Sequence, residues 1–121
     1  MPANDKSLLP LSPAMLHILL ALAPEPLHGY GIMQVIARQS EGAYKVGPGT
    51  LYDNLKKFLD WQWVEEFAVP EPTDSRRDDP RRRYYRLTQL GRDTLNAEIT
   101  RLESVVREAR LHLSPLKTWR S

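Results

Sequence analysis

Residues 47–60, with the sequence GPGTLYDNLKKFLD, combine turn residues with a segment of helical periodicity. Leu51, Leu55 and Phe58 recur at helical spacing, so the segment would form a helix with one apolar face. Its other side carries hydroxyl, carboxylate, amide and ammonium groups, from Thr50, Tyr52, Asp53, Asn54, Lys56 and Lys57. Such groups can hydrogen-bond to phosphates and to base edges in the major groove of DNA. The alternative is an ordinary amphipathic helix that covers a core and exposes a solvated face.

The segment 12–39 predicts two helices before this one. Ser12 and Pro13 are typical of a helix start, and the apolar run that follows them ends at a Pro-Glu-Pro sequence. A second helix opens within the sequence LHGYGI (27–32) and continues to about Gln39. A short Gly-bearing turn joins this second helix to the helix of residues 47–60, which has a polar outward face. Two helices joined in this way form a helix-turn-helix pattern.

Residues 63–88 predict a β-ribbon directly after this pattern. Trp63 to Val69 and Arg81 to Thr88 favour strands, and the polar residues 70–80 between them form a loop. Residues 76–86 hold six arginines against two aspartates, so the ribbon carries a positive patch although the net charge is only +2. A β-ribbon directly after a helix-turn-helix is the wing of a winged-helix domain. The arginines of such a wing would reach phosphates or a minor groove; here they are Arg76, Arg77, Arg81, Arg82 and Arg83. The alternative is a solvated charged loop.

Residues 89–113 predict one long helix. Its apolar residues are spaced 4, 3, 4, 3 and 4 apart, which is a heptad seam. They are Leu95, Ile99, Leu102, Val106, Ala109 and Leu113. The helix would be roughly 37 Å long, which is more than this small domain needs, so we expect the seam to pair with the same helix of a second copy. The alternative is packing on its own domain.

The 121 residues therefore predict a mainly α protein with a small β-ribbon. The expected organisation is a flexible N-terminal arm (1–11), a winged helix-turn-helix domain (12–88), a dimerisation helix (89–113) and a tail (114–121). The longest apolar run, Ile18 to Ala23, is too short to span a bilayer, and the N-terminus does not resemble a signal peptide. We expect a cytoplasmic protein that does not bind membranes.

The residues do not indicate an enzyme, a metal site or a cofactor. The chain has no cysteine, and the sequence GPGT lacks the lysine and the spacing of a phosphate-binding loop. His17, His28 and His112 do not have the spacing of metal ligands. The acidic pairs at 65–66 and 78–79 fall on a strand and a loop tip, where neighbours point apart or into water. We expect no catalytic residue, no metal and no cofactor.

Three motifs resemble those of the PadR-like family of winged-helix transcriptional regulators. They are LHGYGI at 27–32, GTLY at 49–52 and RYYRLT at 83–88, and the resemblance covers about residues 10–113. The length is similar to that of short family members, whose single C-terminal helix serves dimerisation. The resemblance implies a homodimer that binds a pseudo-palindromic operator in double-stranded DNA, usually as a repressor.

The resemblance also implies roles for individual residues. The helix from Thr50 to Lys57 would enter the major groove, and the ribbon 70–82 would be the wing. Tyr30 and Tyr52 would contact the DNA backbone. Further roles follow from side-chain chemistry and not from the resemblance. If the chain binds DNA, the phosphate contacts would come from Lys45, Lys56, Lys57 and the wing arginines, and base contacts would fall at most to Thr50, Asp53, Asn54 and Lys57.

Two positions depart from the family pattern. Asp53 follows the GTLY motif, where the family often has proline or another neutral or basic residue. Its carboxylate would either accept from a cytosine amino group or pair with Lys56 or Lys57. In the family a glycine commonly follows the helix that enters the major groove. Here no glycine lies between that helix and Trp63, which predicts a less tight turn at the end of the helix.

The sequence leaves other functions open. Some short family members bind flat aromatic molecules with a tryptophan of the last helix, but no tryptophan lies between Leu90 and Leu113. We therefore do not extend the binding of aromatic molecules to this chain, and the identity of any small-molecule effector is unknown. A protein-interaction module without sequence-specific DNA binding is the rival function, which Asp53 and the near-neutral charge favour. A MarR-like winged helix is a weaker rival, because that family usually carries more helix on both sides.

Overall fold

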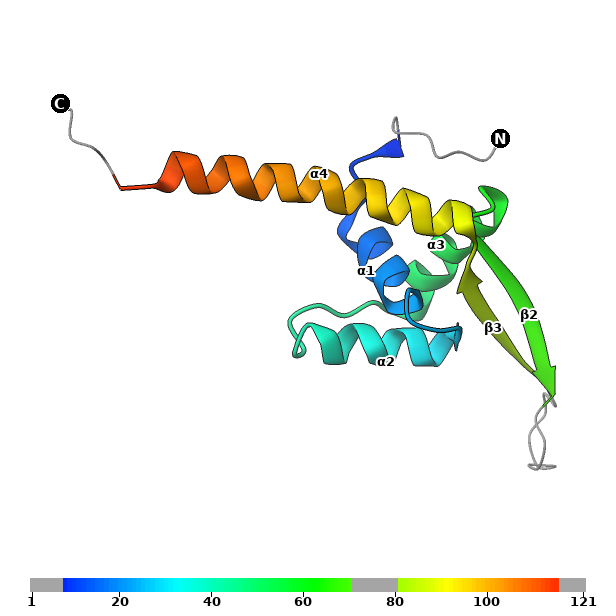
Figure 1. Cartoon of the computed structure of the whole chain (residues 1–121). Coiled ribbons are helices and arrows are strands. Elements are labelled where there is room, and N and C mark those ends of the chain that lie inside the picture. Colours follow the sequence, from blue (N-terminus) through cyan, green and yellow to red (C-terminus); the bar gives the residue numbers. More distant parts are fainter. Residues whose placement is uncertain (1–7, 71–80, 116–121) are drawn as a thin grey trace.

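The computed structural model describes residues 8–70 and 81–115, which form four helices and three strands. The elements are α1 (Pro13–Leu22), β1 (Leu27–His28), α2 (Gly29–Gln39), α3 (Pro48–Asp60), β2 (Val64–Pro70), β3 (Arg81–Leu87) and α4 (Gln89–Leu113). Figure 1 shows α1 between α4 and α2, the two long strands on one side, and α4 running past the other helices. This is a winged helix-turn-helix domain with a long C-terminal helix, so the predicted fold class is confirmed.

Helix α1 forms the centre of the core. Its N-cap is Ser12, whose hydroxyl accepts from the Met15 N–H at 3.2 Å, and Pro13 begins the first turn. The helix contacts α2, α3 and α4. Ile18 and Leu19 have no exposed surface. Because α1 holds α2 and α3 together, it determines which face of α3 is left toward solvent.

The sheet has three antiparallel strands in the order β1-β3-β2, where the sequence predicted a two-stranded ribbon. The additional strand, β1, pairs Leu27 with Tyr85 and His28 with Tyr84. A strand of two residues has no alternation for a sequence pattern to show, and it exists because β3 offers it a partner. The start of α2 is thereby joined to the wing.

Helix α3 ends in a tight turn that corrects the expectation of a loose exit. The Gln62 N–H donates to the Leu59 carbonyl at 3.1 Å, and the Trp63 N–H donates to the Phe58 carbonyl at 2.8 Å. Gln62 has a φ of 64°, the left-handed conformation that glycine usually supplies at this position. The Phe58 and Trp63 rings stack with centroids 5.5 Å apart. Gln62 therefore adopts the glycine conformation itself, and the buried tryptophan closes the turn.

Replacing Gln62 by glycine is expected to stabilise the fold by about 1 kcal/mol, because glycine adopts a positive φ without the clash of a Cβ atom. Urea-induced unfolding would measure the change. Gln62→Ala keeps the Cβ atom and serves as the matched control, with no gain expected. A glycine variant no more stable than the alanine variant would show that Gln62 is not strained.

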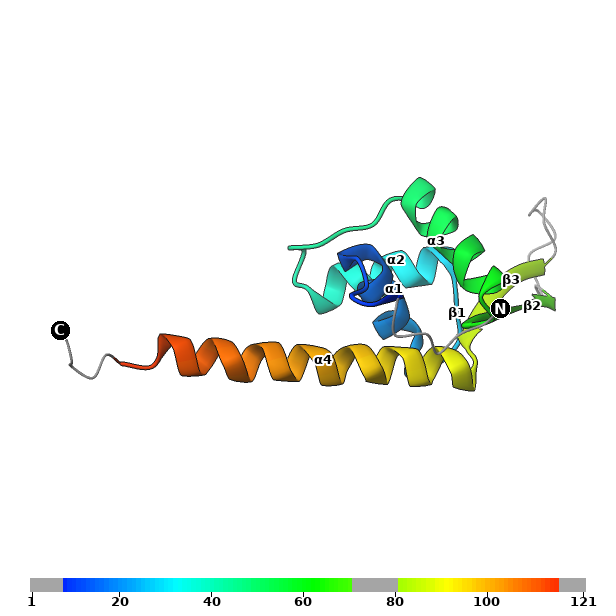
Figure 2. The same ribbon diagram turned by 90° about the horizontal axis from the view of Figure 1, so that it is seen from above.

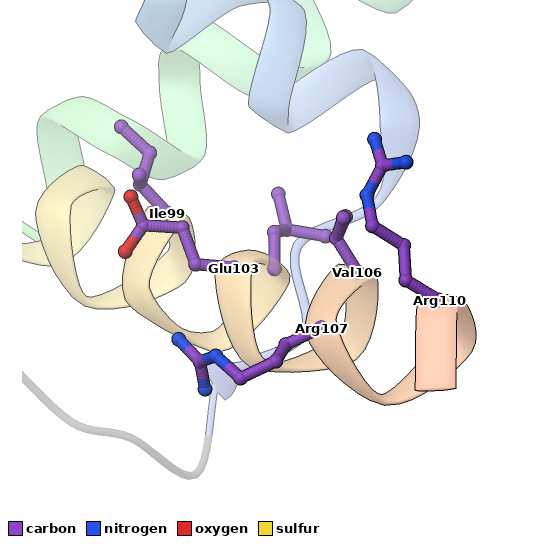
Figure 3. A pocket seen from close by; sticks show the side chains of 6 residues that line it. Ile99, Glu103, Val106, Arg107 and Arg110 are labelled. Atoms are coloured by element: carbon purple, nitrogen blue, oxygen red, sulfur yellow. The ribbon is translucent and has the colours of Figure 1, made fainter. Parts of the chain in front are cut away.

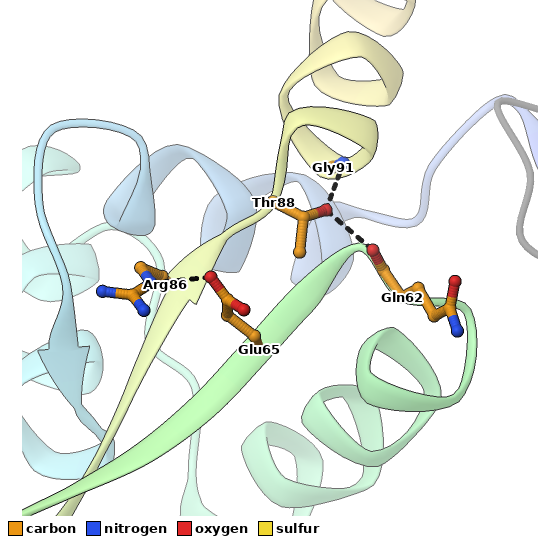
Figure 4. Close-up of polar contacts among 5 residues, drawn as sticks. All are labelled: Gln62, Glu65, Arg86, Thr88 and Gly91. Atoms are coloured by element: carbon orange, nitrogen blue, oxygen red, sulfur yellow. Dashed lines mark hydrogen bonds and ion pairs between the residues drawn. The ribbon is translucent and has the colours of Figure 1, made fainter.

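The turn from β3 into α4 is held against the end of α3 (Figure 4). The Thr88 hydroxyl accepts from the Gly91 N–H at 3.0 Å and donates to the Gln62 carbonyl at 2.7 Å. The Thr88 N–H donates to the Trp63 carbonyl at 3.0 Å. A Cβ atom at Gly91 would overlap that carbonyl oxygen, so this approach requires glycine. These contacts fix the first turn of α4 relative to α3.

Residues 8–11, predicted as the end of a flexible arm, pack against the domain. Leu11 is buried, and its N–H donates to the Glu98 carboxylate at 3.1 Å. That carboxylate is 1% exposed and also accepts from the Arg101 guanidinium at 2.7 and 2.9 Å. The bonds from Arg101, helped by the one from Leu11, hold the pKa of Glu98 below its ordinary value against the opposing effect of burial. The predicted boundary at residue 11 is corrected accordingly; residues 1–7 lie outside the described part.

Helix α4 covers its own domain with its first half and extends past it with its second half (Figure 2). Leu95 is 4% exposed and belongs to the domain core, so its predicted place in a dimer seam is wrong. Ile99 is partly buried against the same core. All residues from 103 to 115 are exposed, including Val106 and Leu113. Neither α4 nor any other helix in the described ranges is long and apolar enough to cross a membrane.

Candidate nucleic-acid interface

Helix α3 has one face in the core and the other toward solvent. Leu51, Leu55 and Phe58 are at most 1% exposed and anchor the inner face. The exposed residues of the predicted site on this helix are Thr50, Tyr52, Asp53, Lys56 and Lys57. Lys45, in the turn before the helix, is also exposed. The structure therefore places five predicted residues on one continuous outer surface of α3.

Asn54 does not belong to that surface, and its predicted role as a base reader has to be corrected. Its side chain is 9% exposed, and its amide nitrogen donates to the Thr50 carbonyl at 2.9 Å. Asn54 lies three residues after Leu51 and four before Phe58, which places it beside the apolar stripe. The side chain therefore satisfies the backbone of its own helix.

Asp53 is exposed on α3, one residue before the buried Asn54. Within residues 8–70 and 81–115, no ion pair joins its carboxylate to Lys56 or Lys57. Of the two roles predicted for Asp53, lysine pairing therefore has no support in the structure. The carboxylate points to solvent with its acceptor capacity available.

Tyr30 and Tyr52 lie where α2 and α3 meet. Tyr30 is 63% exposed and Tyr52 is 48% exposed. The Tyr52 hydroxyl lies over the buried Gly29, and a Cβ atom there would overlap it. Gly29 therefore lets a side chain of α3 rest on the first turn of α2. Two phenol groups beside a helix N-terminus, whose free N–H groups favour anions, are suited to contact phosphate.

His28 joins the start of α2 to the strand β3, which the sequence motif did not reveal. Its Nδ1 accepts from the Gly31 N–H at 3.0 Å and so caps α2. Its Nε2 lies 3.2 Å from a guanidinium nitrogen of Arg82 on β3. Its ring also meets the Tyr84 ring edge-on, with centroids 5.4 Å apart. The available signal was the polar residue immediately before a helix, which is the N-cap position.

The wing arginines that the structure describes have partners. Arg83 pairs with Glu66 at 2.9 Å, and Arg86 pairs with Glu65 at 2.7 Å (Figure 4). These cross-strand pairs offset part of the positive charge that the sequence predicted for the wing. Of the arginines predicted for the wing, Arg76, Arg77 and the side chain of Arg81 lie outside the part of the chain that the structure describes.

An apolar groove of about 450 Å³ lies along α4 where the helix leaves the domain (Figure 3). Its lining residues are Ile99, Leu102, Glu103, Val106, Arg107 and Arg110. Figure 3 shows Ile99 and Val106 on the same side of the helix. Apolar side chains exposed in a row, with charged residues beside them, are typical of a surface that pairs with another protein surface.

The fold and the outer surface of α3 define a winged helix-turn-helix protein of the kind that regulates transcription. The model of the "Transcriptional regulator PadR-like family" matches residues 18–97. A relative, the transcriptional regulator Rv3488 of Mycobacterium tuberculosis, is 36% identical over 94 residues, which are 77% of this chain and 78% of that protein. The chain therefore belongs to the PadR-like family of transcriptional regulators, as the three sequence motifs indicated.

Solved structures agree on the fold. A PadR family transcription regulator from Clostridium difficile R20291 has a TM-score of 0.70 at 20% identity, over 85% of this chain and 100% of that one. Bacillus subtilis PadR in complex with operator DNA has a TM-score of 0.64 at 20% identity, over 93% of this chain and 55% of that one. At these identities the likeness establishes the fold alone.

Proposed function

We propose that this regulator is a homodimeric repressor that binds a pseudo-palindromic operator in double-stranded DNA. The outer surface of α3 carries the proposal. Its hydroxyl, carboxylate and ammonium groups project from a helix whose other face is fixed in the core. A protein of the same fold, Bacillus subtilis PadR, has been solved with operator DNA, which supports the proposal.

The residues divide between positioning and sequence reading. Phosphate contacts supply most of the affinity, and contacts to base edges supply the sequence preference. Lys45, Lys56 and Lys57 would bind phosphates, and the Tyr30 and Tyr52 hydroxyls would fix the position of the helix on the DNA. Thr50 and Asp53 would face the bases, where a carboxylate accepts from the cytosine amino group.

The second half of α4 would form the dimer. Leu102, Val106 and Leu113 continue an apolar surface beyond the domain, where the same surface of a second copy would bury them. Two-fold pairing would present two copies of α3, and a separation of about 34 Å would match one turn of DNA. The pseudo-palindrome in the operator would follow from that symmetry.

A salt titration tests the phosphate contacts. The double variant Lys56→Ala, Lys57→Ala should bind a random-sequence duplex more weakly than the unmodified chain. The slope of log affinity against log salt should fall by about 2 per protomer if each lysine binds one phosphate. Arg92→Ala, which removes an exposed cation from α4, is the matched control and should leave the slope unchanged.

An unchanged slope in the double variant would remove α3 from the proposed interface. No duplex binding by the unmodified chain at any salt concentration would favour the rival function, a winged helix that binds another protein. In that case a stable heteromeric complex should form through the exposed surfaces of α3 or α4.

A further inference from the structure

We propose that two copies of this chain pair their α4 helices in antiparallel orientation, in a register that sets Glu103 of each helix opposite the partner's Arg110. This register rests on the proposed function, because it presupposes the homodimer, and it specifies how the two chains meet. The paired stretch is the exposed second half of α4, beginning at the partly buried Leu102.

The burial of Leu95 selects the register. The apolar residues of the seam are spaced 4, 3, 4, 3 and 4 apart, so an antiparallel pair can match them in more than one way. Pairing over the whole seam would set Leu95 against the partner's Leu113, but Leu95 is 4% exposed and already packs in its own domain. Shifting the partner helix by one heptad frees Leu95 from the pair. Leu102 then faces the partner's Leu113, and Val106 faces the partner's Ala109.

The charged residues beside the seam agree with the shifted register. Glu103 follows Leu102 and Arg110 follows Ala109, so both lie on the same side of the seam. In an antiparallel pair these flanking residues face each other, and the shifted register brings Glu103 to the partner's Arg110. Pairing over the whole seam would set Glu103 against the partner's Glu103. A parallel pair would set it against the partner's Glu98, so both alternatives place like charges together.

Glu103 and Arg110 are available for such a pair. Both side chains are exposed and line the groove, and Figure 3 shows them on either side of Val106 along the helix. The ion pairs within residues 8–70 and 81–115 involve neither of them. Arg107 lies four residues after Glu103, a spacing that allows an ion pair within one helix, yet none forms. The carboxylate of Glu103 is therefore left for a second helix.

The two kinds of contact have different tasks. Exposed ion pairs add little to affinity, so the burial of Leu102, Val106 and Leu113 would supply most of the dimer's stability. Charges beside a helical seam mainly select which orientation and register form, because wrong pairings bring like charges together. Reversing the charges should therefore change which chains pair.

Charge reversal tests the register directly. Glu103→Arg makes both flanking positions basic, and Arg110→Glu makes both acidic. Each variant alone would bring like charges together at both contacts, so its dimer dissociation constant should rise about ten-fold. An equimolar mixture should form a heterodimer about as tight as the unmodified dimer, because opposite charges then meet at both contacts. Sedimentation equilibrium, with a fluorescent label on one chain, would measure the three constants.

Glu25→Arg and Arg92→Glu are the matched controls. They change the net charge of each chain by the same amounts, at exposed positions outside the second half of α4. Both should dimerise normally, alone and when mixed. Variants of Glu103 and Arg110 that behave like these controls would overturn the register, and so would a mixture that is no tighter than the single variants.

Disulfide formation gives a second test, because the chain has no cysteine of its own. Val106→Cys mixed with Ala109→Cys should form a disulfide between the two different chains, since facing positions come within the roughly 7 Å that a disulfide can span. A disulfide between two copies of Val106→Cys would indicate a parallel pair. A disulfide between Leu102→Cys and Val106→Cys would indicate pairing over the whole seam. Either of these results would overturn the proposed register.

Failure of the register and failure of the proposed function give different results. A wrong register would leave the unmodified chain dimeric and able to select inverted half-sites from a random pool. An unmodified chain that is monomeric at every concentration tested would remove the homodimer from the proposed function, and the register with it.

Discussion

Gly91→Ala is expected to lower the free energy of unfolding by about 2–3 kcal/mol, although alanine favours helices more than glycine does. The added Cβ atom would overlap the Trp63 carbonyl oxygen, which already accepts the Thr88 N–H at 3.0 Å. Trp63 has no exposed surface and cannot move aside without disturbing the core. Urea-induced unfolding, monitored by tryptophan fluorescence, would give the difference.

Gly49→Ala is the matched control for this result. Gly49 also lies in the first turn of a helix, but a Cβ atom there would meet no atom within 4 Å. Alanine at this position should therefore be neutral or stabilise the fold by up to about 1 kcal/mol. Equal stability of the Gly91 and Gly49 variants would mean that the contact between α4 and Trp63 is not tight.

The double variant Leu102→Glu, Val106→Glu is expected to be monomeric and to bind a selected duplex at least about 100-fold more weakly. The new carboxylates would place like charges on both helices of the proposed α4 pair, so the two apolar surfaces could no longer be buried against each other. A monomer binds only one half-site, and losing the second half-site lowers the affinity by about 100-fold or more. Sedimentation would report the mass, and fluorescence anisotropy the affinity.

Ser104→Glu adds the same charge to an exposed position of α4 outside the groove residues. This control should remain dimeric and bind normally. A double variant that stays dimeric would exclude the exposed half of α4 as the interface. A monomeric variant with unchanged affinity would show that dimerisation is not needed for DNA binding.

Features set by neighbouring residues were predictable. The bounds of α4 agree with the prediction because Thr88 caps one end and a Ser-Pro sequence ends the other. The inner face of α3 follows from the spacing of Leu51, Leu55 and Phe58. Asn54 falls beside the same stripe, so the periodicity already contained the reason for its burial.

Features set by distant residues were not predictable. Leu95 continues the heptad spacing without a break, yet it packs on its own domain while Val106 is exposed, because the domain ends between them. Periodicity shows that a helix face is apolar and does not show what covers it. The strand β1 depends on β3 in the same way. Gln62 takes a positive φ because the buried Trp63 requires the turn, which local preference alone disfavours.

Selection of duplexes from a random pool by the unmodified chain tests the central claim most directly. We predict enrichment of sequences with two inverted half-sites, their centres about 10 base pairs apart, as two recognition helices related by a two-fold axis require. Thr50→Ala and Asp53→Ala should each change the preference within the half-sites and leave their spacing unchanged. A selected pool with no enrichment over the starting pool would contradict the proposal that this chain is a dimeric, sequence-specific DNA-binding regulator.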